Sequence, residues 1–152
     1  MVPTFWKLSH GQEYFTYKQL LDAMNARLVY VHRGTGGIGG SSVSQATSFV
    51  EVPIGDYFYL THGNQGVYLL GQFVGPANLF SERKGGWLDR PYRFIRSSIT
   101  PESYDGPQKG WSPNYNSTFA RVPESELPEF EELILEPFFG ISLADYGLEL
   151  EA

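Results

Sequence analysis

Two apolar runs joined by a short polar turn constrain the fold more than any other feature of this sequence. Residues 57–61 read YFYLT, residues 67–75 read VYLLGQFVG, and the turn-forming residues HGNQG separate them. Ring-rich, β-branched runs on either side of a glycine-containing turn predict a β-hairpin. Since the first run is apolar at almost every position, we expect both faces of its strand to be buried. Gly71, inside the second run, predicts a bulge or the close approach of another backbone.

Short strands and helices are predicted along the rest of the chain. Alternating or β-branched apolar residues predict strands at residues 5–8, 27–32, 92–96 and 119–122. Apolar residues at helical spacing predict a helix over residues 16–25, with Thr16 as a candidate cap. A second helix is expected after Pro128, within residues 125–135. Residues 41–49 are polar and have only a weak preference, so we interpret them as a loop or an edge strand.

The order of these elements predicts one domain of the α+β class. The 17 glycines and 10 prolines are spread without a period, which favours many turns and short strands. We expect a twisted antiparallel β-barrel of about five to six strands with flanking short helices. This domain is predicted to cover residues 1–140, and residues 141–152 to form a tail or a linker into a larger polypeptide.

Several classes of protein are disfavoured by composition. The chain has no cysteine, which excludes disulfides, thiolate metal sites and a cysteine nucleophile. Its first residues lack the pattern of a signal peptide, and no run approaches the length of a membrane helix. We therefore expect a soluble cytoplasmic protein with no membrane partner.

The net charge of −6 conceals an uneven distribution. Nine acidic and no basic residues follow Arg121, whereas residues 1–121 hold eleven basic and eight acidic residues. The densest group of cations consists of Arg83, Lys84, Arg90, Arg93 and Arg96. A basic cluster of this kind is either a solvated face or a patch that contacts phosphates, and we take these five residues as the candidate phosphate contacts.

Signatures of catalysis are missing from the sequence. Gly34, Gly36 and Gly39 match a dinucleotide fingerprint, but the residues that follow are poor helix formers and no phosphate-binding Gly-Lys-Ser/Thr loop exists. The three histidines are not paired at ligand spacing within one element, so we expect no metal and no other cofactor. We interpret the chain as a binding domain and not as an enzyme.

Aromatic residues make up 16% of the chain, which is enough to suggest more than core filling. A flat base stacks on such rings with roughly 1 to 3 kcal/mol per base. Most rings lie in predicted strands and are expected in the core. Trp87 differs because it follows two glycines in what we expect to be an exposed basic loop. Trp87 is therefore the leading candidate for a ligand pocket.

The hairpin at residues 55–76 resembles the core hairpin of EVE and YTH domains, which belong to the PUA-like superfamily. Residues 5–9, FWKLS, also resemble the first strand of EVE domains, and residues 92–96 resemble the strand after their variable loop. The resemblance covers about residues 4–122. It implies a PUA-like twisted barrel.

YTH domains surround a flipped methylated adenine with rings. Matched by order, the resemblance places such a cage at Tyr30 or His32 and at Trp87, although the family usually has tryptophan at the first of these positions. We add Trp6 and Ser9, from the strand that resembles the EVE opening, as further candidate pocket walls. Pocket reading of a base requires flipping, because a modification inside a duplex cannot be surrounded by side chains.

Similar EVE-like domains stand at the N-termini of McrB-type restriction GTPases, where they read modified DNA bases. The resemblance thus implies double-stranded DNA with a modified, methylated base as the partner, in the targeting domain of a restriction system. Any GTPase or nuclease activity, and any oligomeric assembly, would belong to other domains or subunits. Two alternatives stay open: an RNA-binding PUA-like domain, or a small-molecule or protein interaction domain with purely structural rings.

Overall fold

The computed structural model describes residues 3–37 and 44–146, and it confirms the predicted α+β class. Its principal elements are β1 (Phe5–Ser9), α1 (Tyr17–Ala26), β2 (Leu28–His32), α2 (Gln45–Glu51), β3 (Tyr57–Thr61), β4 (Val67–Phe73), β5 (Trp87–Ser97), β6 (Phe119–Arg121) and α3 (Leu127–Phe130). A π-helical segment, Glu131–Phe139, continues α3 towards the C-terminus. Within the described ranges, none of the helices is both long and apolar enough to cross a membrane.

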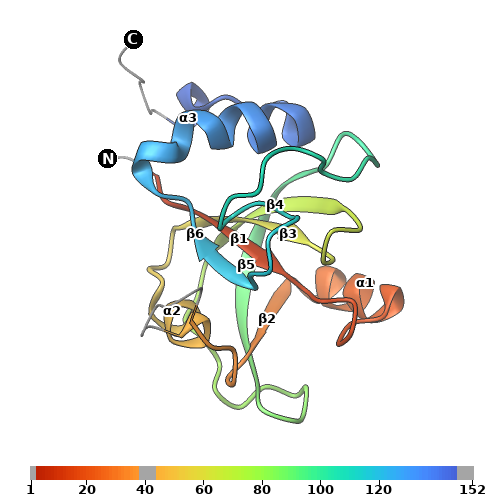
Figure 1. The fold of residues 1–152 in the computed structure, drawn as a ribbon. Coiled ribbons are helices and arrows are strands. Elements are labelled where there is room, and N and C mark those ends of the chain that lie inside the picture. Colours follow the sequence, from red (N-terminus) through yellow and green to blue (C-terminus); the bar gives the residue numbers. More distant parts are fainter. Residues whose placement is uncertain (1–2, 38–43, 147–152) are drawn as a thin grey trace.

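All six strands form one curled sheet in the order β2-β5-β4-β3-β1-β6 (Figure 1). The predicted hairpin is confirmed as the antiparallel pair of β3 and β4. β5 is long enough to pair with β2 through its first half and with β4 through its second half, which curls the sheet. β1 lies parallel to β3, which departs from the all-antiparallel sheet that we expected.

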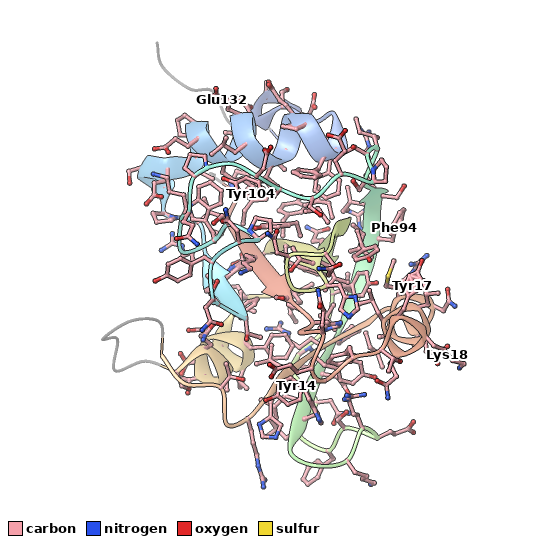
Figure 2. All side chains as sticks on the ribbon, turned by 45° about the vertical axis from the view of Figure 1, so that its right-hand side comes forward. Tyr14, Tyr17, Lys18, Phe94, Tyr104 and Glu132 are labelled. Atoms are coloured by element: carbon pink, nitrogen blue, oxygen red, sulfur yellow. The ribbon has the colours of Figure 1, made fainter. Side chains whose placement is uncertain are left out.

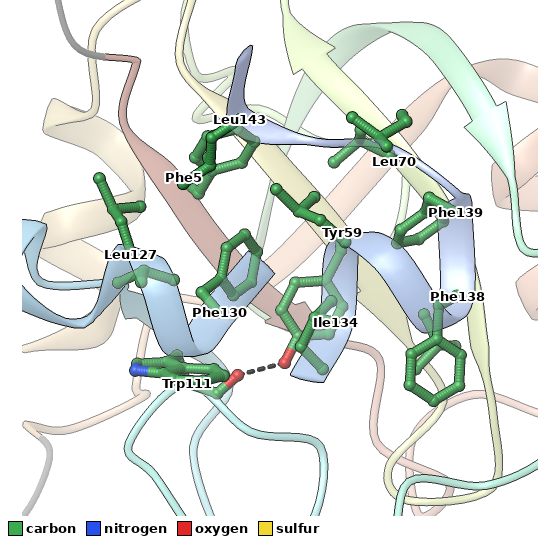
Figure 3. Packing of buried hydrophobic residues seen from close by; sticks show 14 of the residues in the cluster. Phe5, Tyr59, Leu70, Trp111, Leu127, Phe130, Ile134, Phe138, Phe139 and Leu143 are labelled. Carbon is green, nitrogen blue, oxygen red and sulfur yellow. Dashed lines mark hydrogen bonds between the residues drawn. The ribbon is translucent and has the colours of Figure 1, made fainter. Parts of the chain in front are cut away.

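The central strands are buried on both faces, as the apolar run at residues 57–61 predicted. Phe58 and Leu60 face a cluster that also contains α1 and α2 residues, whereas Tyr59 faces a second cluster under the C-terminal helices. Figure 3 shows this second cluster, in which Phe130 packs close to Tyr59 and Phe5. The Tyr59 hydroxyl donates a hydrogen bond to the Trp111 carbonyl, which attaches the long segment before β6 to the sheet.

Local sequence signals explain the first helix and fail for the second. Thr16 caps α1 through a reciprocal capping box with Gln19. The expectation of a loop or edge strand at residues 41–49 is wrong from Ser44 onwards, because Ser44 caps α2 and its Phe49 is fully buried. Residues 41–43 lie outside the described part of the chain. α2 is a tertiary effect, since packing of one apolar face outweighs weak helix propensity.

Two boundaries also differ from the predictions. Trp87 is the first residue of β5 and not part of a preceding loop, because it pairs with His32 of β2. The predicted domain end at residue 140 lies within packed chain, since Ile141 and Leu143 are buried in the cluster under the C-terminal helices. The remainder of the expected tail, residues 147–152, lies outside the described residues.

Gly71 lies at a register shift of β4, which confirms the predicted bulge. The groups that approach it closely are two side-chain rings and not another backbone. A Cβ at this position would lie 2.7 Å from Phe58 Cζ and 2.8 Å from Tyr92 Cδ2. Both rings belong to the buried cluster, so neither can move without disturbing its neighbours. Glycine is therefore required here by space and not by backbone angle.

Substitution Gly71→Ala is expected to lower the free energy of unfolding by about 1 to 3 kcal/mol, because the added methyl overpacks the core. Gly110→Ala is the matched control, since a Cβ there would meet no atom within 4 Å. Urea denaturation of both variants measures the difference. Equal stability of the two variants would contradict the packing of Phe58 and Tyr92 against Gly71.

Candidate nucleic-acid interface

A cavity of about 530 Å³ opens where the end of β1, the start of β5 and the segment before β6 meet. Volumes of this size are typical of small-ligand sites. Its wall is formed by Ser9, Gly11, Gln12, Glu13, Tyr14, Phe15, His32, Thr35, Gly63, Asn64, Trp87 and residues 113–118. Figure 2 shows Tyr14 at the end of the molecule opposite the C-terminal helices, where Glu132 lies. Much of the acidic C-terminal region is thus distant from the cavity.

Trp87 is the centre of an aromatic wall. Its ring meets Phe15 and His32 edge to face, with centroids 5.3 and 5.2 Å apart, and Tyr14 at 5.9 Å. The indole is partly exposed and lines the cavity. Fixed rings at a cavity wall can stack on a planar ligand without losing rotamer entropy of their own.

His32 is held rigidly beside Trp87, its cross-strand partner. Its Nδ1 accepts a hydrogen bond from the Gly34 N–H at 3.0 Å, so Nε2 carries the hydrogen and donates to the Gly85 carbonyl at 2.7 Å. These bonds connect the start of the glycine-rich segment to the turn before β5. Residues 38–40 of that segment lie outside the described residues. His32 therefore presents its ring, and not a ring nitrogen, to a ligand.

Arg83 packs against the aromatic wall from the loop before β5. Its guanidinium carbon lies 4.0 Å from the Phe15 centroid and 4.7 Å from the Trp87 centroid. The same group donates to the Tyr14 carbonyl. A guanidinium that stacks on rings while keeping part of its charge near solvent can contact a phosphate at the cavity rim.

Amides and hydroxyls form the rest of the wall. Gln12 donates through Nε2 to the His62 carbonyl at 3.2 Å, which leaves its Oε1 as an acceptor for a ligand. Asn64 and Asn116 are exposed, and their side chains make no hydrogen bond within the described residues. Ser9 accepts from the Gly63 N–H at 3.2 Å. The cavity thus combines ring faces with donors and acceptors, which suits a planar heterocycle with a polar edge.

Lys7 fixes the wall formed by residues 113–118 from behind. It is 1% exposed, and its Nζ donates to the Tyr115 carbonyl at 2.8 Å and to Ser117 Oγ at 3.0 Å. Ser117 in turn donates to the Gly110 carbonyl at 2.6 Å. Burial lowers the pKa of Lys7 to about 7. A lysine within an otherwise apolar strand is the sequence signal for such a buried structural role, although Lys7 was not among the predicted site residues.

The shifted pKa of Lys7 makes stability depend on pH. The folded chain releases this proton near pH 7 and the unfolded chain near the ordinary value of 10.5, so between these limits the unfolded chain binds more protons. We expect the free energy of unfolding to rise with pH from about 7 to about 10.5, by up to ~1.4 kcal/mol per pH unit from this group. Below pH 7 the contribution is constant, because both states are protonated.

Denaturation at a series of pH values measures this slope. Lys7→Met should remove it, while Lys18→Met, at an exposed lysine that pairs with Asp22, should retain it. Identical slopes in the wild type and Lys7→Met would contradict the burial of an unpaired ammonium group at this position.

His10 supports the aromatic wall from below. Its ring stacks on Phe15 with centroids 4.3 Å apart, and its Nε2 accepts a hydrogen bond from the Tyr30 N–H at 3.0 Å. Burial, with a smaller contribution from Arg83, lowers the pKa of His10 to about 3. His10 is therefore neutral at physiological pH and acts as a packed ring that positions Phe15.

The five residues predicted for the pocket are only partly brought together. Ser9, His32 and Trp87 line the cavity. Tyr30 instead borders a second, smaller hollow of about 230 Å³, and Phe15 lines both this hollow and the cavity. Trp6 lies outside both, stacked on Phe119 at 4.4 Å with its Nε1 donating to Asp56 at 3.0 Å.

Arg90 differs most from the predicted group of phosphate contacts. It is 1% exposed, and its guanidinium donates four hydrogen bonds to the carbonyls of Gly75, Phe49 and Val52, between 2.6 and 3.1 Å. The group also lies 4.7 Å from the Phe73 centroid. Arg90 therefore joins α2 to the sheet and has no surface for a phosphate.

Loss of the Arg90 guanidinium is expected to destabilise the fold, because Arg90→Met leaves three buried carbonyls without a donor. The cost should be about 3 kcal/mol or more. Arg93→Met is the matched control on the same strand, and at an exposed position its effect should stay within about 0.5 kcal/mol. Chemical denaturation distinguishes the two. If Arg90→Met is as stable as the wild type, the hydrogen bonds of Arg90 do not stabilise the fold.

The other predicted cations lie at different distances from the cavity. Lys84 is exposed in the turn beside Arg83. Arg93 bonds to Gln72, and Arg96 donates to the Phe139 carbonyl at 3.1 Å, at the end of the C-terminal helix. Six and nine residues along β5 from Trp87, they are roughly 20 and 30 Å away. Arg33, which sequence reasoning missed, lies next to Gly86 and is exposed near the rim.

Over residues 3–37 and 44–146, no group of three or more histidine, cysteine, aspartate or glutamate side chains is placed to hold a metal ion.

Comparisons with known proteins agree with the fold. No protein-family model and no curated protein matches the sequence. A crystal structure from Pseudomonas putida has a TM-score of 0.50 and 11% identity, over 85% of this chain and 98% of that chain. A protein from Agrobacterium tumefaciens gives 0.47 and 13%, over 83% and 89% of the two chains. Human THYN1, in complex with DNA containing 5-methylcytosine, gives 0.38 and 15%, over 85% and 75%.

The similarity to the Pseudomonas putida protein concerns the fold alone. With its curled six-stranded sheet and short flanking helices, the described part of the chain is an α+β fold with a twisted, barrel-like sheet.

Proposed function

We propose that this domain binds nucleic acid and holds one extruded, modified base in the cavity between Trp87 and the amide-rich wall. The observation that carries the proposal is the composition of that cavity: fixed rings on one side, and donors and acceptors on the other. A nucleobase has flat π faces and a hydrogen-bonding edge, so it matches both walls at once.

The rim favours a nucleic acid over a free heterocycle. Arg83 is fixed against the rings, and the exposed Lys84 and Arg33 lie nearby. Phosphates on either side of an extruded base would pass these cations, and their attraction would offset part of the cost of unstacking. The acidic C-terminal helices, at the other end of the molecule, would not repel the strand at this site.

A methylated base in double-stranded DNA is the ligand that we favour, and a restriction system is the setting. Both rest on the resemblance of the hairpin and of β1 to EVE and YTH domains. In this setting the domain targets the complex to modified DNA in the cytoplasm, and any GTPase or nuclease activity resides in other domains or subunits.

Removal of the Trp87 ring should weaken binding to the modified base. Loss of one stacking partner costs roughly 1 to 3 kcal/mol, or about 5-fold to 150-fold in affinity. Fluorescence anisotropy can measure the affinity of the Trp87→Ala variant for DNA and RNA oligonucleotides. These oligonucleotides carry 5-methylcytosine, N6-methyladenine or no modification. Thermal melting of the same variant shows whether the fold is retained.

Trp6→Phe is the matched control, because Trp6 lies outside the cavity and stacks on Phe119. This variant should keep the affinity and the preference for modified bases. The proposed function is wrong if folded Trp87→Ala keeps the full preference of the wild type, or if the wild type binds none of the oligonucleotides. Preference for RNA over DNA would assign the same cavity to the RNA-binding alternative.

A further inference from the structure

Leu79 and Phe80 are apolar side chains that point into solvent in the loop between β4 and β5. Leu79 is 60% exposed. Phe80 is 90% exposed, more than any other large apolar residue among those described. Adjacent exposed apolar side chains on an ordered loop favour a contact surface, because their exposure to water is unfavourable. The cavity does not include either residue.

The loop that carries these residues is held in place. Asn78 pairs with Asp89 of β5 through two backbone hydrogen bonds of 2.7 and 3.3 Å. The Asn78 side chain accepts from the Phe80 N–H at 3.0 Å, which fixes the backbone at the loop tip. Further along, the Arg83 guanidinium donates to the Tyr14 carbonyl. Phe80 is thus exposed by the shape of the loop and not by a loose chain end.

The loop tip lies close to the cavity. Arg83, three residues after Phe80, contacts Phe15 and Trp87 of the aromatic wall, and three residues span at most about 10 Å. On the other side, Asn78 pairs with Asp89, two residues from Trp87. In Figure 1 this loop projects from the sheet at the end opposite the C-terminal helices. An exposed ring and a ring-lined cavity therefore belong to one edge of the domain.

We propose that Phe80, supported by Leu79, is a wedge that enters a DNA duplex and fills the space left by the base extruded into the cavity. This inference rests on the proposed function and adds to it that the partner is a duplex and not a single strand. Extrusion leaves an unstacked gap, and an inserted apolar side chain restores part of the lost stacking. Apolar wedges of this kind insert between base steps in many proteins that deform DNA.

Charge around the wedge favours DNA over a protein partner. Arg83 and Lys84 follow it in the same loop, and Arg33 lies beside the turn at Gly86, while Glu82 is the acidic residue within the loop. Cations beside an apolar tip suit a phosphate backbone that passes next to the base step the tip enters. A protein-binding patch would instead need a wider apolar surface than two adjacent side chains.

The test compares Phe80→Ala with the wild type on a duplex and on the matching single strand, each with the modification that the wild type binds most tightly among 5-methylcytosine and N6-methyladenine. We expect the variant to lose about tenfold or more in affinity for the duplex, and to stay within about twofold for the single strand. Ile99→Ala is the matched control, since Ile99 is also exposed, at 65%, and lies against the end of the C-terminal helix.

A 2-aminopurine next to the modified base reports unstacking in the same duplex. Fluorescence should differ between the wild type and Phe80→Ala complexes at saturation, because the inserted ring is missing. Equal losses on duplex and single strand, no loss on the duplex, or binding of the wild type to single strands alone would each overturn the wedge while leaving the cavity proposal intact. Absence of all nucleic-acid binding by the wild type would overturn both.

Discussion

Burial of β3 on both faces is the constraint on which the rest of this structure depends. Phe58 and Leu60 require α1, α2 and the curled end of the sheet on one side, and Tyr59 requires the C-terminal helices on the other. A sheet with one solvent-exposed face would need helices on its other face only. β1 lies directly beside β3, so the same two-sided burial fixes the position of Ser9 at the end of β1, where the cavity begins.

The cavity depends on two polar attachments within these apolar layers. Tyr59 bonds to the Trp111 carbonyl, and Lys7 bonds to Tyr115 and Ser117. Both hold the segment before β6, which has little regular structure of its own but supplies one wall of the cavity. An irregular segment attached in this way can present amides at fixed positions, as reading the edge of a base requires.

The basic cluster shows how one run of charge is divided by the fold. Along β5, Arg90 points into the core, whereas Arg93 and Arg96 lie further along the strand. Arg83 packs against the rings from the loop before β5. Charge density in the sequence therefore overstated the phosphate-contacting surface. Lys84 and Arg33 add to Arg83 at the rim, and Arg33 lies on a different element, where counting charges within one segment could not find it.

The sequence by itself determined the elements that depend on local order: the hairpin with a bulge at Gly71, the capped helix α1 and the ring-rich strands. Periodicity and capping act between residues a few positions apart, so they are readable from the chain. Tertiary structure alone decided that α2 is a helix, that Trp87 pairs with His32 and meets Phe15, and that Arg90 is buried. Each of these depends on contacts between residues about 20 or more positions apart, which no local pattern encodes.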